Sequence, residues 1–136
     1  MWNMGGPSIQ TLGVALVKQL REGLGASVPI VLSEGLPFGR AWAVPAQAAQ
    51  QAEDNGYLAA AFAQLKEGGD ANLHYVNTSM LFGPEAARDS GTAAGLHATD
   101  AGMHDMAAAW VRVLRGLGLC GGGVHRPGRS KKWLQK

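Results

Sequence analysis

The sequence predicts an α/β fold with parallel strands, because helical and strand patterns alternate along the chain. Apolar residues at three- and four-residue steps predict a first helix that ends at Gly23 or Gly25, a second over about 46–66 and a third over about 100–115. Two short segments between these helices, 28–32 and 72–76, predict strands. The expected order is helix, strand, helix, strand, helix.

The first helix and the first strand suggest where a ligand would bind. The predicted buried face of the helix consists of the branched residues at helical spacing: Ile9, Leu12, Val14, Leu16, Val17 and Leu20. Glu34 follows the strand over 28–32, at the carboxyl end where open α/β sheets bind ligands. We therefore treat Glu34 as a substrate-facing candidate, with a solvated loop carboxylate as the alternative.

The second helix is expected to bury Leu58, Phe62 and Leu65, and a break at Asn55-Gly56 is left open. After the second strand, residues 77–98 form a connection long enough to suggest function. Two parallel strands expose their edges and are too few to bury helices on both faces of a complete sheet. The chain is therefore expected to hold only part of an α/β sheet.

Thr99 is expected to cap the last helix, because its hydroxyl can accept a hydrogen bond from a free N–H of the first turn. Asp100 then faces the positive end of the helix dipole. The predicted buried face consists of the apolar residues at three- and four-residue steps: Met103, Met106, Ala107, Trp110, Leu114 and Leu117. His97 is held just outside the helix N-terminus, in a polar loop, which is a fixed position for a base.

Charge is divided unevenly along the 136 residues, whose net charge is +2. Residues 1–110 carry five Lys/Arg and ten Asp/Glu, whereas 111–136 carry seven Lys/Arg and no acid. The basic, glycine-rich segment 116–136 is predicted to be a disordered tail, with a nucleic-acid-binding arm as the alternative; we do not expect nucleic acid as a partner. One cysteine, Cys120, excludes an internal disulfide framework. No signal peptide or membrane span is predicted.

Several motifs resemble those of one enzyme family, the SGNH (GDSL-like) hydrolases. One branch of that family carries a block of the form Asp-Gly-x-His-Pro-Thr-Asp-x-Gly before its last helix. The matching positions here are Gly95, His97, Thr99, Asp100 and Gly102. Ala94 replaces the family's catalytic Asp and Ala98 its Pro. Further matches are Trp2-Asn3-Met4, which resembles the end of the family's third strand, and the strands over 28–34 and 72–76. The resemblance covers residues 1–115, the predicted domain.

The resemblance implies a three-layer α/β/α flavodoxin-like SGNH fold, here truncated to about two parallel strands and three helices. It implies carboxylic ester hydrolysis through Ser, His and Asp, with His97 as general base and Asn3 as oxyanion donor. The expected partner is an ester-linked small molecule or an acylated carbohydrate. No serine lies in a Gly-Asp-Ser-like block, and Ala94 has no carboxylate. We therefore expect the chain alone to be inactive, although Asp100 remains an alternative acid.

Two other classes of function remain as alternatives. The first is a non-catalytic remnant of the fold that binds an acyl or sugar ligand or docks on a full-length relative. The second is a nucleic-acid-binding protein that acts through the basic tail. A metal site formed by His97, Asp100 and His104 is not predicted, because no Cys or further His lies at ligand spacing. No cofactor is expected.

Overall fold

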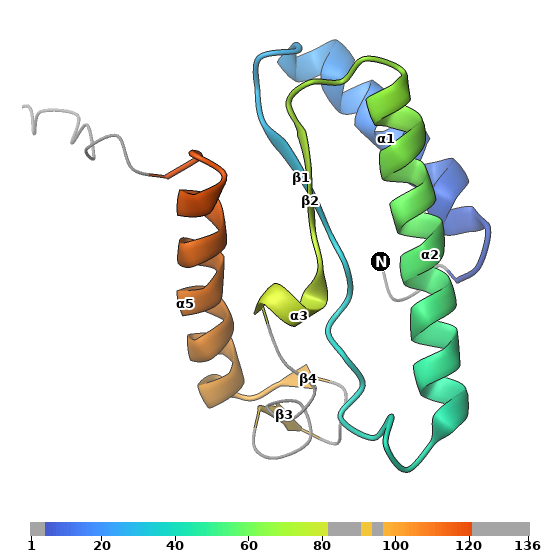
Figure 1. Cartoon of the computed structure of the whole chain (residues 1–136), viewed down its shortest axis with the longest axis vertical. Coiled ribbons are helices and arrows are strands. Elements are labelled where there is room, and N and C mark those ends of the chain that lie inside the picture. The colour runs from blue at the N-terminus through green and yellow to red at the C-terminus, as the bar shows by residue number, and fades with distance from the viewer. Residues whose placement is uncertain (1–4, 82–90, 94–96, 121–136) are drawn as a thin grey trace, which may run out of the picture.

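The structure is a computed structural model, and it describes residues 5–81, 91–93 and 97–120. Its helices are α1 (Ser8–Leu24), α2 (Pro45–Glu67), α3 (Thr78–Leu81) and α5 (Asp100–Gly116) (Figure 1). Its strands are β1 (Ile30–Ser33), β2 (Leu73–Val76), β3 (Thr92–Ala93) and β4 (His97–Ala98). The predicted α/β alternation is confirmed: α1, β1, α2, β2 and α5 follow one another as expected.

Strand β1 pairs with β2 in parallel, with Ile30 opposite Leu73 and Ser33 opposite Val76. The 23-residue helix α2 connects them, as a parallel pair requires. This helix runs through Asn55-Gly56 without a break. The two strands therefore end at the same edge of the sheet.

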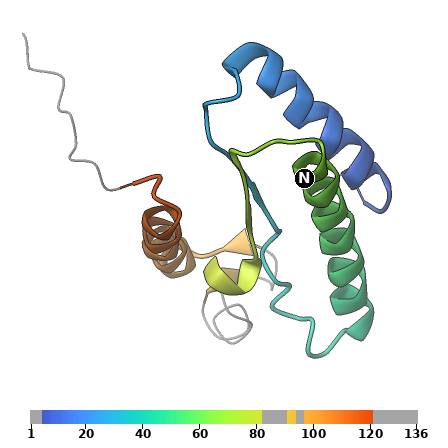
Figure 2. The same cartoon turned by 45° about the horizontal axis from the view of Figure 1, so that its top comes forward.

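Helices cover both faces of this sheet. Helices α1 and α2 lie on one side and α5 on the other (Figures 1 and 2). The first core joins α1 and α2 to the sheet through Ile9, Val14, Val17, Ile30, Leu32, Leu58, Ala61, Leu65 and Leu73. The second core joins α3 and α5 to the sheet through Val76, Leu81 and Ala109, with Val31 and Trp110 packed against them. This is the predicted three-layer α/β/α arrangement.

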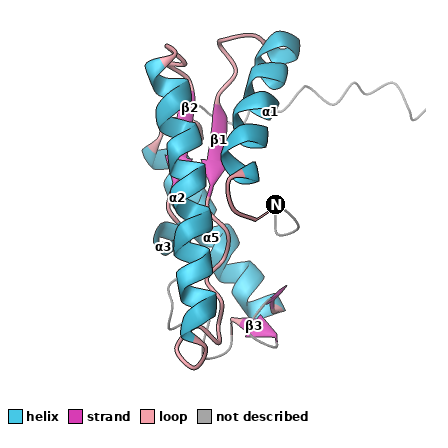
Figure 3. Ribbon diagram, turned by 90° about the vertical axis from the view of Figure 1, so that its right-hand side faces the viewer, coloured by secondary structure: helices cyan, strands magenta, loops and turns pink. Residues whose placement is uncertain are grey.

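The predicted buried face of α1 is partly wrong. Ile9, Val14 and Val17 are buried as expected, but the row of leucines beside them is not. Leu12 is 48% exposed and Leu16 is 50% exposed. Helix α1 lies beside β1 on the side away from β2 (Figure 3), and the described residues contain no further strand on that side.

The predicted face of α5 is also shifted around the helix. Met106, Trp110 and Leu117 of the predicted face pack against the second core, which confirms that part of it. Met103 is 54% exposed and Ala107 is exposed, whereas Ala109 is buried and Val113 packs against the second core in their place. A further contact holds the N-terminus of this helix, because Gly102 lies against the backbone of Gly91. The spacing of apolar residues along the sequence does not predict this contact.

Parts of the connection over 77–98 are ordered in ways that the sequence did not predict, namely α3 and the β3–β4 pair. Of the predicted tail, 116–120 continue from α5, and Leu117 packs against the second core; 121–136 lie outside the described residues. None of the helices in the described part of the chain combines the length and hydropathy needed to cross a bilayer.

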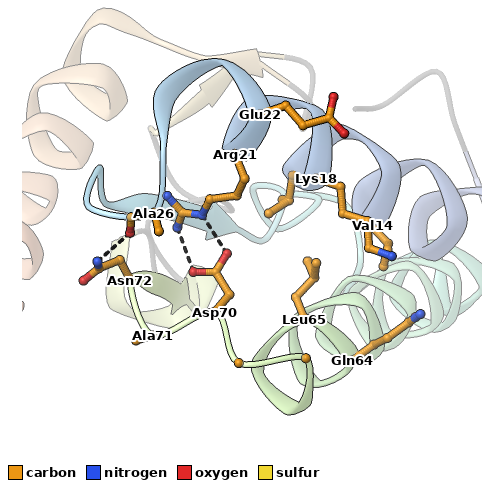
Figure 4. Close-up of a pocket in the computed structure, with 13 residues that line it drawn as sticks. Val14, Lys18, Arg21, Glu22, Ala26, Gln64, Leu65, Asp70, Ala71 and Asn72 are labelled. Atoms are coloured by element: carbon orange, nitrogen blue, oxygen red, sulfur yellow. Dashed lines mark hydrogen bonds and ion pairs between the residues drawn. The ribbon is translucent and has the colours of Figure 1, made fainter.

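An ion pair fastens α1 to the start of β2. The Arg21 guanidinium donates two hydrogen bonds to Asp70, from Nε to Oδ2 at 2.8 Å and from Nη2 to Oδ1 at 2.9 Å (Figure 4). Its Nη1 also donates to the carbonyls of Gly25 and Val28. A cavity of about 640 Å³ adjoins the pair, at the amino ends of the strands. Ligands of open α/β sheets bind at the opposite, carboxyl end, so we assign this cavity no role in catalysis.

The Arg21–Asp70 pair makes stability depend on pH. The hydrogen bond from Arg21 lowers the pKa of Asp70 below its ordinary 3.8. The pair therefore stabilises the fold above the ordinary pKa, and this contribution is lost as the pH falls through the lowered value. We expect the difference in free energy of unfolding between wild type and Asp70→Asn to shrink as the pH is lowered below about 4.

Urea denaturation at a series of pH values measures this difference. Glu67→Gln, which changes an exposed carboxylate near the same turn, is the control, and its difference from wild type should vary less over the same pH range. If the difference in free energy of unfolding between wild type and Asp70→Asn stays constant down to the lowest pH, the Arg21–Asp70 pair does not contribute to the pH dependence of stability.

Candidate active site

The carboxyl ends of β1 and β2 bring polar residues together. Glu34 follows β1, and its N–H donates to the Val76 carbonyl of β2 at 3.1 Å. Asn77 follows β2, and α3 begins at the next residue, Thr78. Because parallel strands end at one edge, residues 43 positions apart in the chain become neighbours here. The candidate site lies at this edge.

The Glu34 carboxylate accepts three hydrogen bonds from this edge. Its Oε1 accepts from the Tyr75 hydroxyl at 2.8 Å and from Asn77 Nδ2 at 3.3 Å, and its Oε2 accepts from the Thr78 N–H at 2.9 Å. Burial, reinforced by the Glu34 carboxylate, raises the pKa of the Tyr75 phenol, which therefore stays protonated as a donor. Glu34 thus ties β1 to β2 and to the first turn of α3.

A cavity of about 400 Å³ opens beside this carboxylate. Its apolar wall consists of Pro37, Phe38, Ala41, Ala48 and Ala52, and its polar lining of Glu34, Gln51, Asn55, Asn77, Thr78 and Ser79. The Gln51 amide fixes the loop that forms one wall: Nε2 donates to the Leu36 carbonyl at 2.6 Å, and Oε1 accepts from the Phe38 N–H at 3.3 Å. An apolar pocket with a few polar groups is the usual form of a small-molecule site.

His97 lies on a strand rather than in the predicted loop. Strand β4 pairs antiparallel with β3, with Ala93 opposite His97 and Thr92 opposite Ala98. Both strands lie near α3, at the end of the molecule where β1 and β2 end (Figures 1 and 2). The His97 side chain is exposed. An exposed imidazole on a fixed backbone can accept a proton from a bound reactant.

The contact between Gly91 and Gly102 holds this strand against α5. The Gly91 carbonyl accepts from the Thr99 N–H at 2.9 Å, and the Thr99 hydroxyl accepts from the Gly102 N–H at 3.2 Å, which confirms the predicted cap. A Cβ on Gly102 would overlap the Gly91 carbonyl oxygen and lie 2.9 Å from its carbon. Only glycine fits at position 102, and the hydrogen bond from Thr99 to Gly91 holds the residue that follows β4 against the start of β3.

The structure brings together some of the sequence-predicted residues and omits others. Glu34 and His97 lie toward the same end of the molecule, where the strands end. Asn3 and Ala94 lie outside the described residues. Asp100 is exposed in the first turn of α5, and no hydrogen bond to the His97 ring is seen among the residues described.

Metal chemistry finds no support in the described ranges. No group of three or more His, Cys, Asp or Glu side chains there is arranged to bind a metal ion. His104 contacts its neighbour Asp105 at 3.3 Å, and both side chains are exposed. Cys120 is an exposed, free cysteine.

Comparison with known proteins decides the family. A sequence profile described as the GDSL-like Lipase/Acylhydrolase family matches residues 1–115. The chain belongs to this family. The match covers the segment that contains both Asn3 and His97, and the two parallel strands between them. The fold of this GDSL-like chain is thus that of esterases and acyltransferases of the family.

A solved structure supports the same fold for this GDSL-like chain. The salicylyl-acyltransferase SsfX3 from a tetracycline biosynthetic pathway superposes with a TM-score of 0.69 and 22% sequence identity. The superposition covers 82% of this chain and 33% of that chain, so the present chain spans about a third of the acyltransferase. A comparison with curated proteins finds no match.

Several residues of this candidate site were not predicted from the sequence. Tyr75 and Gln51 were read only as parts of a strand and a helix, although each fixes the edge near Glu34. The Gly91–Gly102 contact was also missed. A signal was present, because Gly91 follows a serine at a turn and Gly102 interrupts the first turn of a helix, but their pairing is a property of the fold.

The Gly91–Gly102 contact predicts the effect of a single methyl group. Gly102→Ala should lower the free energy of unfolding by about 1–3 kcal/mol, the usual cost of overpacking, because α5 and residue 91 must separate. Gly116→Ala is the matched control on the same helix. A Cβ there meets nothing within 4 Å, so this variant should gain up to about 1 kcal/mol from helix propensity. Equal effects in urea denaturation would contradict the account.

Because Glu34 accepts three hydrogen bonds, its substitution should destabilise the fold more than a substitution at an ordinary surface position. Glu34→Gln places an amide N–H₂ against existing donors, so we expect a loss of about 1–3 kcal/mol in the free energy of unfolding. Glu53→Gln is the control, since Glu53 accepts one long hydrogen bond from Tyr57 on the exposed side of α2, at 3.4 Å. It should change stability by less than about 0.5 kcal/mol. Similar losses for both variants would show that the Glu34 network adds no stability.

Proposed function

We propose that this chain carries the general base and an oxyanion donor of an ester-cleaving acyl-transfer site, with His97 as the base and Asn3 as the donor. The observation that supports this most directly is the anchoring of His97. Strand β4, the Thr99 cap and the Gly91–Gly102 contact fix its backbone, and the imidazole remains exposed.

The chemistry of this site requires a nucleophile that the chain does not offer. In acyl transfer a serine hydroxyl attacks the ester carbonyl, a histidine takes the hydroxyl proton, and a carboxylate orients the histidine. No serine here lies in a Gly-Asp-Ser-like block, and position 94, where the family has its Asp, is alanine. The chain alone should therefore show no measurable ester turnover.

The proposed substrate is an ester-linked small molecule or an acylated carbohydrate. The 400 Å³ cavity supports this, because its apolar wall suits an acyl or aryl group and Glu34 and Asn77 provide a polar lining. In this role Glu34 faces the substrate while its carboxylate orders the edge. The neighbouring fold is that of a salicylyl-acyltransferase, so an acceptor hydroxyl could replace water in the second half of the reaction.

Reconstitution tests the proposal. Mixing the chain with the N-terminal half of a GDSL-like enzyme, which carries the nucleophilic serine, should give measurable hydrolysis of p-nitrophenyl acetate. Ala94→Asp should raise this rate, because a carboxylate three residues before His97 can orient the ring and stabilise its charged form. His97→Ala should lower it by about 10²–10⁴-fold, the usual contribution of a general base.

His104→Ala is the matched control for this experiment. His104 is also exposed, on α5, where its ring contacts the neighbouring Asp105, so its loss should leave the rate unchanged. Reconstituted activity that survives His97→Ala would contradict the proposed base. A fall in rate on Ala94→Asp, with the fold retained, would show that another carboxylate already orients the ring.

A second candidate function is a non-catalytic docking module of the same fold. One observation favours it, the exposed row of leucines on α1. Hydrolysis after reconstitution separates the two candidates, because a docking module would remain inactive even when the N-terminal half with its nucleophilic serine is supplied.

A further inference from the structure

The hydroxyl groups that line the cavity beside Glu34 donate their protons within the protein. Thr78 Oγ1 donates to the Gly35 carbonyl, and Ser79 Oγ donates to Asn77 Oδ1 at 2.7 Å. The Ser79 N–H also donates to Asn77 Oδ1, at 2.8 Å, which fixes the orientation of that amide. A hydroxyl has one proton, so the Ser79 oxygen offers a ligand only its lone pairs.

The amide groups of the lining are used in a similar way. Gln51 Nε2 donates to the carbonyls of Leu36 and Gly35, at 2.6 and 3.4 Å, and so uses both of its protons. Asn77 Nδ2 donates to the neighbouring carboxylate at 3.3 Å. Asn55 is the other amide of the lining, and its side chain can offer either a donor or an acceptor. The cavity therefore presents mainly hydrogen-bond acceptors.

Glu34 adds a negative charge to these acceptors, and it is the one side chain of the lining that can carry a charge. Its three donors, Tyr75, Asn77 and Thr78, are neutral. Among the residues that the structure describes, no cationic side chain forms an ion pair with it. A carboxylate has about four lone-pair positions, and Oε2 accepts a single hydrogen bond, so this oxygen can accept another.

We propose that this cavity binds a primary ammonium group, and that the substrate of the acyl-transfer site is an ester that carries one. An ammonium group has three donors and no acceptor, which matches the free lone pairs of Glu34 and Ser79. Hydrogen bonds between charged groups are about twice as strong as neutral ones. Phe38 and the alanines of the apolar wall contact the hydrocarbon part of the ligand. An anionic ligand meets a like charge here.

This inference rests on the proposed function for the ester but not for the cation. The lining comes from residues 34–79, whereas the proposed base and oxyanion donor are His97 and Asn3. Binding of an ammonium compound to the chain needs no nucleophile. A failure to bind would leave the reconstituted hydrolysis unaffected, and a failure of hydrolysis would leave the binding result standing.

NMR titration of the full chain with three probes tests the proposal. The probes are 2-phenylethylammonium, 2-phenylethanol and 3-phenylpropanoate, which share a phenyl group and a short chain and differ in charge. The ammonium compound should bind at least about tenfold more tightly than the alcohol, and the carboxylate should bind most weakly. The amide signals of Thr78 and Ser79 should shift on binding.

Glu34→Gln separates the effect of charge from that of shape. This variant should bind the ammonium compound and the alcohol with similar affinity. Glu53→Gln is the matched control, because it removes an exposed carboxylate on α2 outside the lining, and it should keep the wild-type preference. If Glu34→Gln unfolds, Ser79→Ala replaces it. That variant removes an exposed hydroxyl and should lower the affinity for the ammonium compound by about tenfold.

The amide spectrum of each variant shows whether it is folded. The proposal would be overturned if no probe binds, or if the alcohol or the carboxylate binds wild type as tightly as the ammonium compound. It would also be overturned if folded Glu34→Gln keeps the full preference for the ammonium compound or, where Ser79→Ala is the variant used, if the affinity stays at the wild-type value.

Discussion

The parallel pairing of β1 with β2 is the constraint on which the rest of the structure depends. Its register sets Ser33 opposite Val76, so both strands end together and Glu34 can accept hydrogen bonds from three groups of the next strand and helix. The same pairing divides the side chains between two cores, with Leu32 facing α1 and α2 and Val31 facing α5. Every element near the candidate site is positioned relative to this pair.

A second contact converts that scaffold into a candidate site. The sheet alone would leave His97 at the end of a long connection, where a base has no defined position. The pairing of β4 with β3, the close approach of Gly91 to Gly102 and the Thr99 cap hold the strand that carries the histidine against the start of α5. Catalytic groups act through position as much as through acidity, so this anchoring is what supports the proposed role of His97 in acyl transfer.

The order of the main elements could be predicted from the sequence. The spacing of apolar residues and the glycines that end helices are local signals, which do not depend on the tertiary structure. Thr99 was likewise recognisable as a cap from its place before Asp100. Two other features depend on the whole fold. Which side of α1 is buried depends on where the sheet ends, so Leu12 and Leu16 were wrongly placed in the core. The pairing of β3 with β4 depends on a two-residue ladder too short to give a period.

The central claim is that His97 is presented on a rigid strand rather than on a free loop. Amide hydrogen exchange at Thr99 measures this most directly, because its N–H donates to the Gly91 carbonyl at 2.9 Å and joins β4 to the residue that contacts α5. The account predicts that this amide exchanges as slowly as the buried amides of α5. Exchange at the rate of an unstructured peptide, with α5 still protected, would contradict it, because His97 would then have no fixed position.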